Sequence, residues 1–118
     1  MATITLQAKS SAELRPSFTA LARQLKALGD PTRLALVALL ARREHCVCDL
    51  MAVLALPQST CSHHLGVLKR AGLVHDRRGG DARWAYYALV PEATAALRAQ
   101  FGTVLDLDHF DPTPADCA

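Results

Sequence analysis

The sequence predicts a mainly α-helical domain that carries one β-hairpin. Its 118 residues suit a single domain with a modest core, which gains further burial in an oligomer. Hydrophobic residues make up 51% of the chain and aromatic residues only 5%, a composition that favours helices over a sandwich or barrel. Apolar residues recur at helical spacing along most of the chain and alternate only in residues 73–89. We therefore expect helices on both sides of a short antiparallel strand pair.

Two helices are expected near the N-terminus, after a flexible arm at residues 1–16 that lacks periodicity. The first spans about residues 17–28, where apolar side chains share one face. Gly29 ends it, Asp30 caps the next helix, and Pro31 occupies the first turn of that helix. The apolar positions of the second helix are Leu34, Val37, Leu39 and Leu40. They cover much of its girth, so we expect this helix at the centre of the core.

Two more helices follow, with a sharp break between them. The apolar positions of the first are Leu50, Val53 and Leu54. Pro57 separates it from a second helix at about residues 58–71, and Gly72 supplies the C-terminal stop. The inward-facing residues of this second helix are expected to be Cys61, Leu65 and Leu68. A helix, a tight turn and a helix that begins with Gln, Ser and Thr form the helix-turn-helix pattern.

The period then changes to that of a strand. Residues 73–89 predict a hairpin around a charged, glycine-containing turn at 77–83. A last helix is expected at about 92–105, followed by an acidic, mobile tail at 106–118. A helix-turn-helix followed by a basic hairpin is a winged helix-turn-helix. We assign residues 17–105 to a winged helix-turn-helix domain that binds DNA.

The charge of the chain is unevenly distributed. The formal net charge is only +2. Residues 1–98 contain all 13 Lys and Arg against 7 Asp and Glu, a net of +6, whereas residues 99–118 contain four Asp and no Lys or Arg. A basic body with an acidic tail favours an anionic partner for the body, here double-stranded DNA.

The sequence carries no signal for export or for a membrane partner. No apolar run approaches the roughly 20 residues that a bilayer-spanning helix needs. The first 17 residues lack the apolar region of a secretory signal. We therefore expect a cytoplasmic protein. Thiols stay reduced in that compartment, so four cysteines indicate metal-binding, redox-sensing or buried residues rather than a disulfide framework.

A recognition helix needs short polar side chains that approach base edges, and its surroundings need cations that neutralise phosphates. The candidate base-facing residues are Gln58, Ser59, Thr60, Ser62 and His63. His64 is expected to pack against the protein or to contact a phosphate. The candidate phosphate contacts are Lys69, Arg70, Arg77, Arg78 and Arg83. Taken singly, each of these residues is more often part of a solvated surface than a DNA contact, but a polar helix face and a basic wing on this fold coincide rarely.

The stretch HCVCDL places Cys46 and Cys48 one residue apart. Two such residues lie about 200° apart around a regular helix, so both thiols face one ion only where the backbone is not helical or is distorted. The start of a helix also favours a thiolate over a thiol. A ligand site, a redox pair and two small buried side chains all remain open for this motif.

The chain resembles the ArsR/SmtB family of metal-responsive winged-helix repressors. The stretches that carry the resemblance are LKALGDPTRLALVALL, CVCDL, LPQSTCSHHLGVLKRAGLV and the arginine-rich wing, within about residues 21–105. The resemblance implies a homodimer whose first and last helices form the interface. It also implies a repressor that binds its operator until an inducer releases it. The CVCDL form is similar to that of the arsenite-responsive members.

The resemblance implies As(III) or Sb(III) as the inducer ligand, held by thiolates of Cys46 and Cys48. Relatives of this type often have a third cysteine where this chain has Met51. We expect Cys117, in the tail, as the third ligand and Cys61 as a core residue. Two thiols alone suit an organic trivalent arsenical. The last helix has no histidine, so the zinc site that other relatives carry there is not expected.

Two alternatives remain beside an arsenic- or antimony-responsive repressor. A thiol redox or sulfide sensor of the same fold would form a disulfide, for which Cys117 is the expected partner because a Cys46–Cys48 bond closes a small ring. An enzyme such as a reductase would need a nucleophile in a loop that cradles its substrate. No such loop flanks Cys46. We therefore expect no catalytic residue and no organic cofactor.

Overall fold

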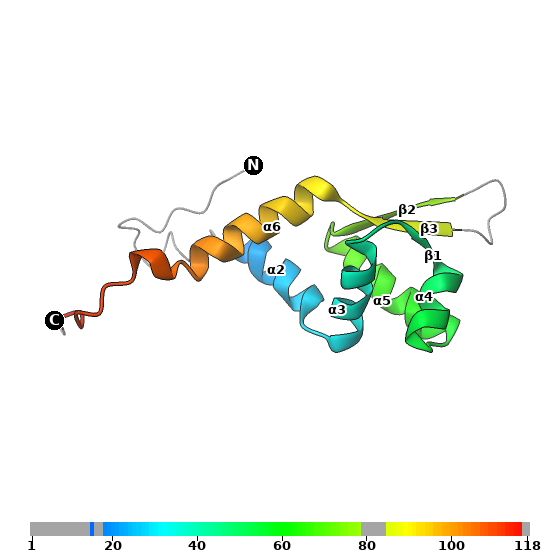
Figure 1. Ribbon diagram of the computed structural model, residues 1–118, viewed down its shortest axis with the longest axis horizontal. Coiled ribbons are helices and arrows are strands. Elements are labelled where there is room, and N and C mark those ends of the chain that lie inside the picture. The colour runs from blue at the N-terminus through cyan, green and yellow to red at the C-terminus, as the bar shows by residue number, and fades with distance from the viewer. Residues whose placement is uncertain (1–14, 16–17, 79–84, 117–118) are drawn as a thin grey trace.

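The computed structural model describes residues 15, 18–78 and 85–116. The sequence folds there into helices packed on a small antiparallel sheet (Figure 1). In chain order the elements are α2 (Thr19–Leu28), α3 (Pro31–Leu40), β1 (His45–Cys46), α4 (Val47–Leu54), α5 (Gln58–Arg70), β2 (Val74–Arg78), β3 (Ala85–Leu89), α6 (Pro91–Val104) and the 3-10 turn η1 (Leu107–His109). This order confirms the mainly helical prediction with a hairpin before the last helix.

The turn between α2 and α3 follows the predicted capping pattern. Asp30 is extended, with φ −145° and ψ 133°, and its carboxylate accepts a hydrogen bond of 3.0 Å from the backbone N–H of Arg33. Pro31 lies at the first helical position, where its missing N–H costs nothing. The cap therefore fixes the start of α3.

The helix-turn-helix consists of α4 and α5, which pack against each other. Ala55, with φ 52° and ψ 49°, turns the chain out of α4 in the left-handed region. Pro57 is extended and immediately precedes α5, as the sequence predicted. Gly72, with φ 78°, turns the chain from the end of α5 toward β2, a conformation that glycine adopts without strain.

The sheet has three strands in the order β1–β3–β2. β2 pairs antiparallel with β3, from Val74 opposite Leu89 to Arg78 opposite Ala85. The predicted hairpin is thus present, but Arg77 and Arg78 belong to β2 rather than to the turn. β1, which pairs with the other edge of β3, was not predicted because two residues are too short for a visible alternation.

The core lies where α3, α4 and α5 meet the sheet. The fully buried side chains are Leu36, Leu50, Cys61, Leu65 and Leu68. The inward face predicted for α5 is therefore confirmed. Two core predictions were wrong: the side chains of Leu34 and Val53 are 52% and 61% exposed. Leu34 lies about 200° around α3 from Leu36. Val53 lies only about 60° around α4 from Leu50, but on the side away from Met51 and Leu54, which pack against the core.

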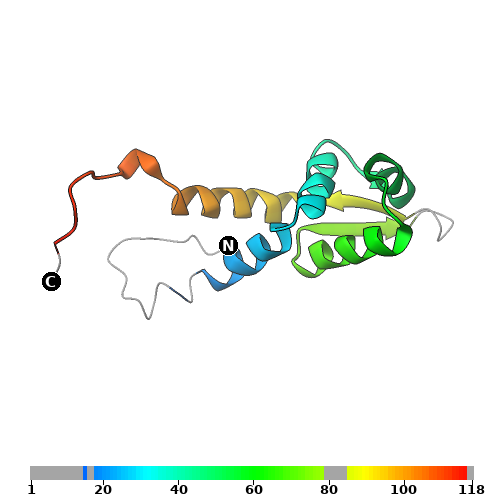
Figure 2. The same ribbon diagram turned by 90° about the horizontal axis from the view of Figure 1, so that it is seen from below.

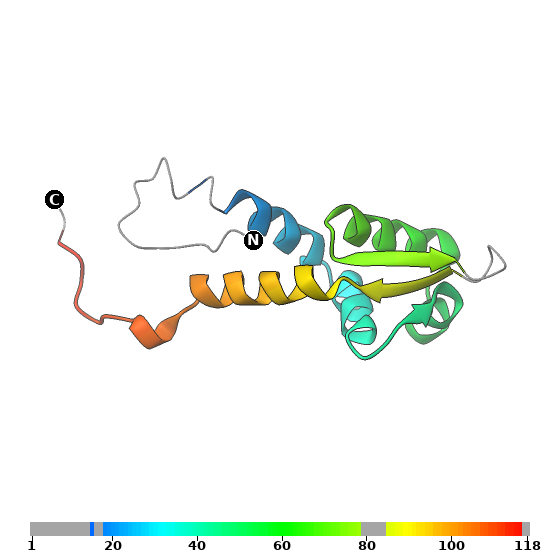
Figure 3. The same cartoon turned by 90° about the horizontal axis from the view of Figure 1, so that it is seen from above.

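α6 runs beside α2 and continues beyond it, where η1 and the tail leave the body (Figures 1 and 3). The two helices enclose an apolar hollow of about 170 Å³, lined by Phe18, Leu21, Ala22, Leu25, Phe101 and Val104. Phe101 and Val104 remain about 40% exposed there. Within the described part of the chain, no helix is long and apolar enough to cross a membrane.

Candidate nucleic-acid interface and thiol site

α5 presents a polar exposed face along one long side of the molecule (Figures 2 and 3). The predicted DNA-binding residues on this face are Gln58, Ser59, Ser62, His63, Lys69 and Arg70. At 100° per residue they fall within about 140° of one another, so one partner surface meets all of them. Thr60 is half-buried at the edge of this face.

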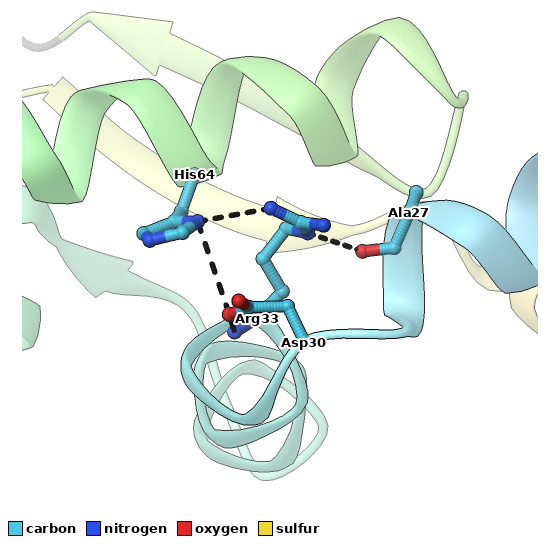
Figure 4. Close-up of polar contacts among 4 residues, drawn as sticks. All are labelled: Ala27, Asp30, Arg33 and His64. Atoms are coloured by element: carbon cyan, nitrogen blue, oxygen red, sulfur yellow. Dashed lines mark hydrogen bonds and ion pairs between the residues drawn. The ribbon is translucent and has the colours of Figure 1, made fainter.

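His64 points from α5 into the junction of α2 and α3 (Figure 4). Its side chain is only 15% exposed, and its Nδ1 lies 3.2 Å from Nη1 of Arg33 and 4.0 Å from Oδ2 of Asp30. A guanidinium only donates, so Nδ1 of His64 is the acceptor. Nε of Arg33 donates to the carbonyl oxygen of Ala27. His64 thus packs against the protein, one of the two roles expected for it.

Neighbouring groups also stabilise the charged form of the Asp30 carboxyl. The hydrogen bond from the backbone N–H of Arg33 lowers the pKa of Asp30 below its ordinary value, and the charge of the nearby Arg33 guanidinium acts in the same direction. Asp30 and Arg33 therefore join the N-terminal end of α3 to the side of α5 that faces away from solvent.

Two of the predicted phosphate contacts form ion pairs within the protein. Nζ of Lys69 lies 2.6 Å from Oδ1 of Asp76. Nη2 of Arg77 lies 2.6 Å from Oε1 of Glu44, and its guanidinium stacks 5.0 Å from the ring centre of Tyr86. Sequence analysis missed Glu44 and Tyr86, because nothing local indicates a contact across the sheet.

Of the two remaining predicted wing residues, the structure gives the strand position of Arg78 but does not describe Arg83. Arg78 ends β2 opposite Ala85. Arg83 lies outside the described residues.

The thiol motif lies where β1 meets α4. Cys46 is both the last residue of β1 and the N-cap of α4, with extended backbone at φ −74° and ψ 156°, and Cys48 lies in the first turn of α4. The non-helical backbone at Cys46 brings the two sulfur atoms together, which confirms the condition set by helix geometry. The structure joins them as a disulfide, with Cα atoms 5.4 Å apart. The expectation that Cys117 would be the easier disulfide partner was therefore wrong.

The two cysteines of the pair differ in their exposure to solvent. Cys46 is buried, whereas Cys48 is exposed. The carboxylate of Asp49 lies within 4.8 Å of both sulfur atoms, so the described residues bring one oxygen donor to the pair. Asp49 directly follows Cys48 in the sequence but was not predicted as a donor.

None of the other sulfur-containing residues considered as a third ligand is placed at the pair by the described part of the chain. Met51 packs against the core. Cys61 is fully buried, and burial raises the pKa of its thiol, so it stays protonated and makes a poor ligand. Cys117 lies outside the described residues. Once the disulfide is reduced, two thiol sulfurs and one carboxylate would suit a soft ligand that needs only two sulfur donors.

Known proteins resemble both the motif region and the whole fold. The family model for bacterial regulatory proteins of the arsR family matches residues 30–76. The uncharacterized HTH-type transcriptional regulator MJ1325 of Methanocaldococcus jannaschii is 47% identical over 68 residues, which cover 57% of this chain and 74% of that protein. The arsenic resistance transcriptional regulator ArsR1 of Pseudomonas putida is 43% identical over 85 residues, which cover 71% of this chain and 65% of that protein.

Solved structures extend the likeness to the whole fold. A possible transcriptional regulator for arsenical resistance is 38% identical, with a TM-score of 0.63 over 75% of this chain and 98% of its own. The homodimeric winged helix-turn-helix DNA-binding domain of Mb0332 from Mycobacterium bovis, a possible ArsR-family regulator, is 30% identical, with a TM-score of 0.63 over 90% of this chain and 99% of its own. The chain therefore belongs to the ArsR family of bacterial regulatory proteins, which are transcriptional regulators and not enzymes.

Proposed function

We propose that this regulator represses transcription by binding operator DNA as a homodimer and is released when As(III) or Sb(III) binds Cys46 and Cys48. The observation that carries the proposal is the convergence of the two sulfur atoms at the first turn of α4, the helix that packs on α5. The names of similar proteins, among them a regulator of arsenic resistance, support the same ligand class.

Two routes connect a ligand at the thiols to the DNA-facing elements. α4 packs on α5, so a change in the first turn of α4 is felt by the recognition helix. Cys46 also pairs with Tyr86 in β3, and Tyr86 stacks with Arg77 of the wing. Glu44, two residues before Cys46, holds the same arginine. The ligand releases DNA only if it binds the DNA-incompetent arrangement more tightly, and such couplings typically amount to about 1–3 kcal/mol.

The homodimer is supported by the apolar hollow between α2 and α6. Phe101 and Val104 leave apolar surface exposed beside it, and a second copy would cover that surface by two-fold symmetry. The homodimeric Mb0332 domain has the same fold. A dimer also presents two α5 helices to two half-sites, which is how helix-turn-helix proteins bind palindromic operators.

The donor set favours ligands that need two sulfurs. As(III) and Sb(III) prefer thiolates over oxygen donors, and the described residues bring two sulfurs and the Asp49 carboxylate together. An inorganic ion would therefore need a further thiol, for which Cys117 stays a prediction. An organic trivalent arsenical, with two exchangeable positions, would need none.

A thiol redox sensor is the second candidate. The Cys46–Cys48 disulfide is the observation that favours it, because oxidation and a bridging ligand link the same two sulfur atoms. In this alternative the disulfide itself changes the start of α4 and releases the DNA.

Fluorescence anisotropy of reduced protein on DNA from its own promoter separates the candidates. The protein is titrated in parallel with arsenite, antimonite, phenylarsine oxide, zinc and peroxide. We expect release by the trivalent arsenicals or antimonite, and we expect Cys46→Ser and Cys48→Ser to bind DNA normally but to resist release. Release by peroxide alone would establish the redox sensor instead.

A further variant tests the third ligand, and two outcomes would remove the proposal. Cys117→Ser should lose the response to arsenite while it keeps the response to phenylarsine oxide; an unchanged arsenite response would exclude Cys117. If both Cys46→Ser and Cys48→Ser still respond to arsenite, the inducer site lies elsewhere. If the wild-type protein does not bind its promoter, the chain does not act as an operator-binding repressor there.

A further inference from the structure

A second basic surface adjoins the exposed face of α5. It is a hollow of about 250 Å³ between α2, the start of α3 and the C-terminal end of α5. Its lining consists of four cationic side chains, from Arg23, Lys26, Arg33 and Arg70, over a floor of Ala27, Val67 and Ala71. Among the described residues that line it, none is acidic. We call it the cation hollow.

The cation hollow continues the face of α5 that the sequence assigns to DNA. At 100° per residue, Arg70 lies within about 20° of Ser59 on the helix surface. A Cβ atom at Gly66 would come within 3.3 Å of Nη1 of Arg70, so the guanidinium lies back along this same face. α2 and α5 follow one another along the same side of the molecule (Figures 2 and 3).

The lining combines one cation that is held by protein contacts with others that are exposed to solvent. Arg33 is held by the carbonyl oxygen of Ala27 and by His64, so its charge is positioned before any partner binds. Arg23 and Lys26 are exposed on α2, one helical turn apart. One held cation and several exposed ones around an apolar floor suit a single anionic group that arrives from solvent.

We propose that the cation hollow binds a phosphate of the DNA backbone that flanks the major groove entered by α5. The 13 residues of α5 make a helix of about 20 Å, whereas the major groove is about 12 Å wide. One end of α5 therefore reaches a flanking backbone when its polar first turns lie in the groove. The inference rests on the proposed DNA binding and adds α2 to the contact surface, beside the recognition helix and the wing.

The test compares two double variants that remove the same charge. Arg23→Ala with Lys26→Ala empties part of the cation hollow. Arg42→Ala with Arg43→Ala removes two exposed cations from the connection between α3 and β1, on the opposite side of the molecule from α5 (Figures 2 and 3). Binding to promoter DNA is measured by anisotropy from 0.05 to 0.4 M salt, and sedimentation of each variant reports its oligomeric state.

Loss of each phosphate contact should lower the slope of log affinity against log salt by about 0.9 and weaken binding about fivefold at 0.15 M salt. We expect a slope lower by about 1 to 2 for Arg23→Ala with Lys26→Ala and a smaller change for the control. Equal changes in both double variants would reduce the effect to net charge and overturn the proposal. An unchanged slope with a weakened dimer would assign the hollow to subunit contact, which also overturns it. DNA binding by the wild-type protein in the same assay keeps these outcomes separate from a failure of the proposed function.

Discussion

If the wing contacts DNA phosphates, as the sequence predicts, Glu44 competes with the DNA for Arg77. Arg77 must then leave Glu44, whose carboxylate lies 2.6 Å away, before it reaches a phosphate. The side chains are 61% and 34% exposed, and ion pairs in such settings contribute about 0.2–1 kcal/mol. Removal of the pair by Glu44→Gln removes this cost, so operator affinity should rise between about 1.4-fold and fivefold, at about 1.4 kcal/mol per tenfold change.

A double-mutant cycle isolates the part of this gain that passes through Arg77. Operator affinity is measured by anisotropy at 0.15 M salt for wild type, Glu44→Gln, Arg77→Ala and the double variant. The gain should vanish in the Arg77→Ala background. Glu92→Gln, in the first turn of α6, removes one negative charge elsewhere and should leave the affinity unchanged.

Two results would refute the reasoning. An equal gain from Glu44→Gln with and without Arg77 would mean that the carboxylate acts on DNA through its charge alone. A loss of affinity in Glu44→Gln would mean that Glu44 presents Arg77 to the DNA instead of competing for it. In that second case, the stacking of Arg77 on Tyr86, and not its ion pair with Glu44, would limit how far Arg77 reaches toward the DNA.

Two further predictions concern stability. Gly72→Ala should lower the free energy of unfolding by about 1–2 kcal/mol because φ at this position is 78°. Gly102→Ala, in α6 with open space around it, should raise the free energy of unfolding by up to about 1 kcal/mol. Urea unfolding of the two variants measures both changes. Asp30 has a lowered pKa in the folded protein, so its contribution is complete above its ordinary pKa and is lost as pH falls through the lowered value. Asp30→Asn keeps a side chain able to cap α3 but does not titrate, so the urea midpoint of wild type should fall more than that of the variant between about pH 4 and pH 2; parallel curves would refute this.

Local signals in the sequence were sufficient for the helices and their ends. Asp30 and Pro31 mark the start of α3, and Pro57 marks the start of α5, because capping and proline geometry act over a few residues. The face of α5 that carries Cys61 and Leu65 also follows from helical spacing alone. These features depend on the chain within about two helical turns.

Contacts between distant segments could not be predicted in the same way. The ion pair of Glu44 with Arg77 depends on β1 joining the far edge of β3, and β1 is too short to leave a pattern. The contact of His64 with Arg33 spans 31 residues, so helical spacing placed His64 off the polar face without indicating its partner. The short distance between Cys46 and Cys48 could not be predicted from periodicity, because it depends on the helix beginning between them.

In the proposed mechanism, the effect of a ligand at the thiols depends on this position of the helix start. Cys46 is buried and paired with Tyr86, so its sulfur moves with the sheet, whereas Cys48 is exposed and moves with α4. A ligand that bridges the two sulfur atoms therefore fixes the angle between the sheet and α4. The same two cysteines inside a regular helix would diverge by about 200° and could not be bridged. α4 packs on α5 and the sheet carries the wing. In the proposed mechanism, a change in this angle therefore moves the recognition helix relative to the wing, so that a single stretch of DNA no longer contacts both.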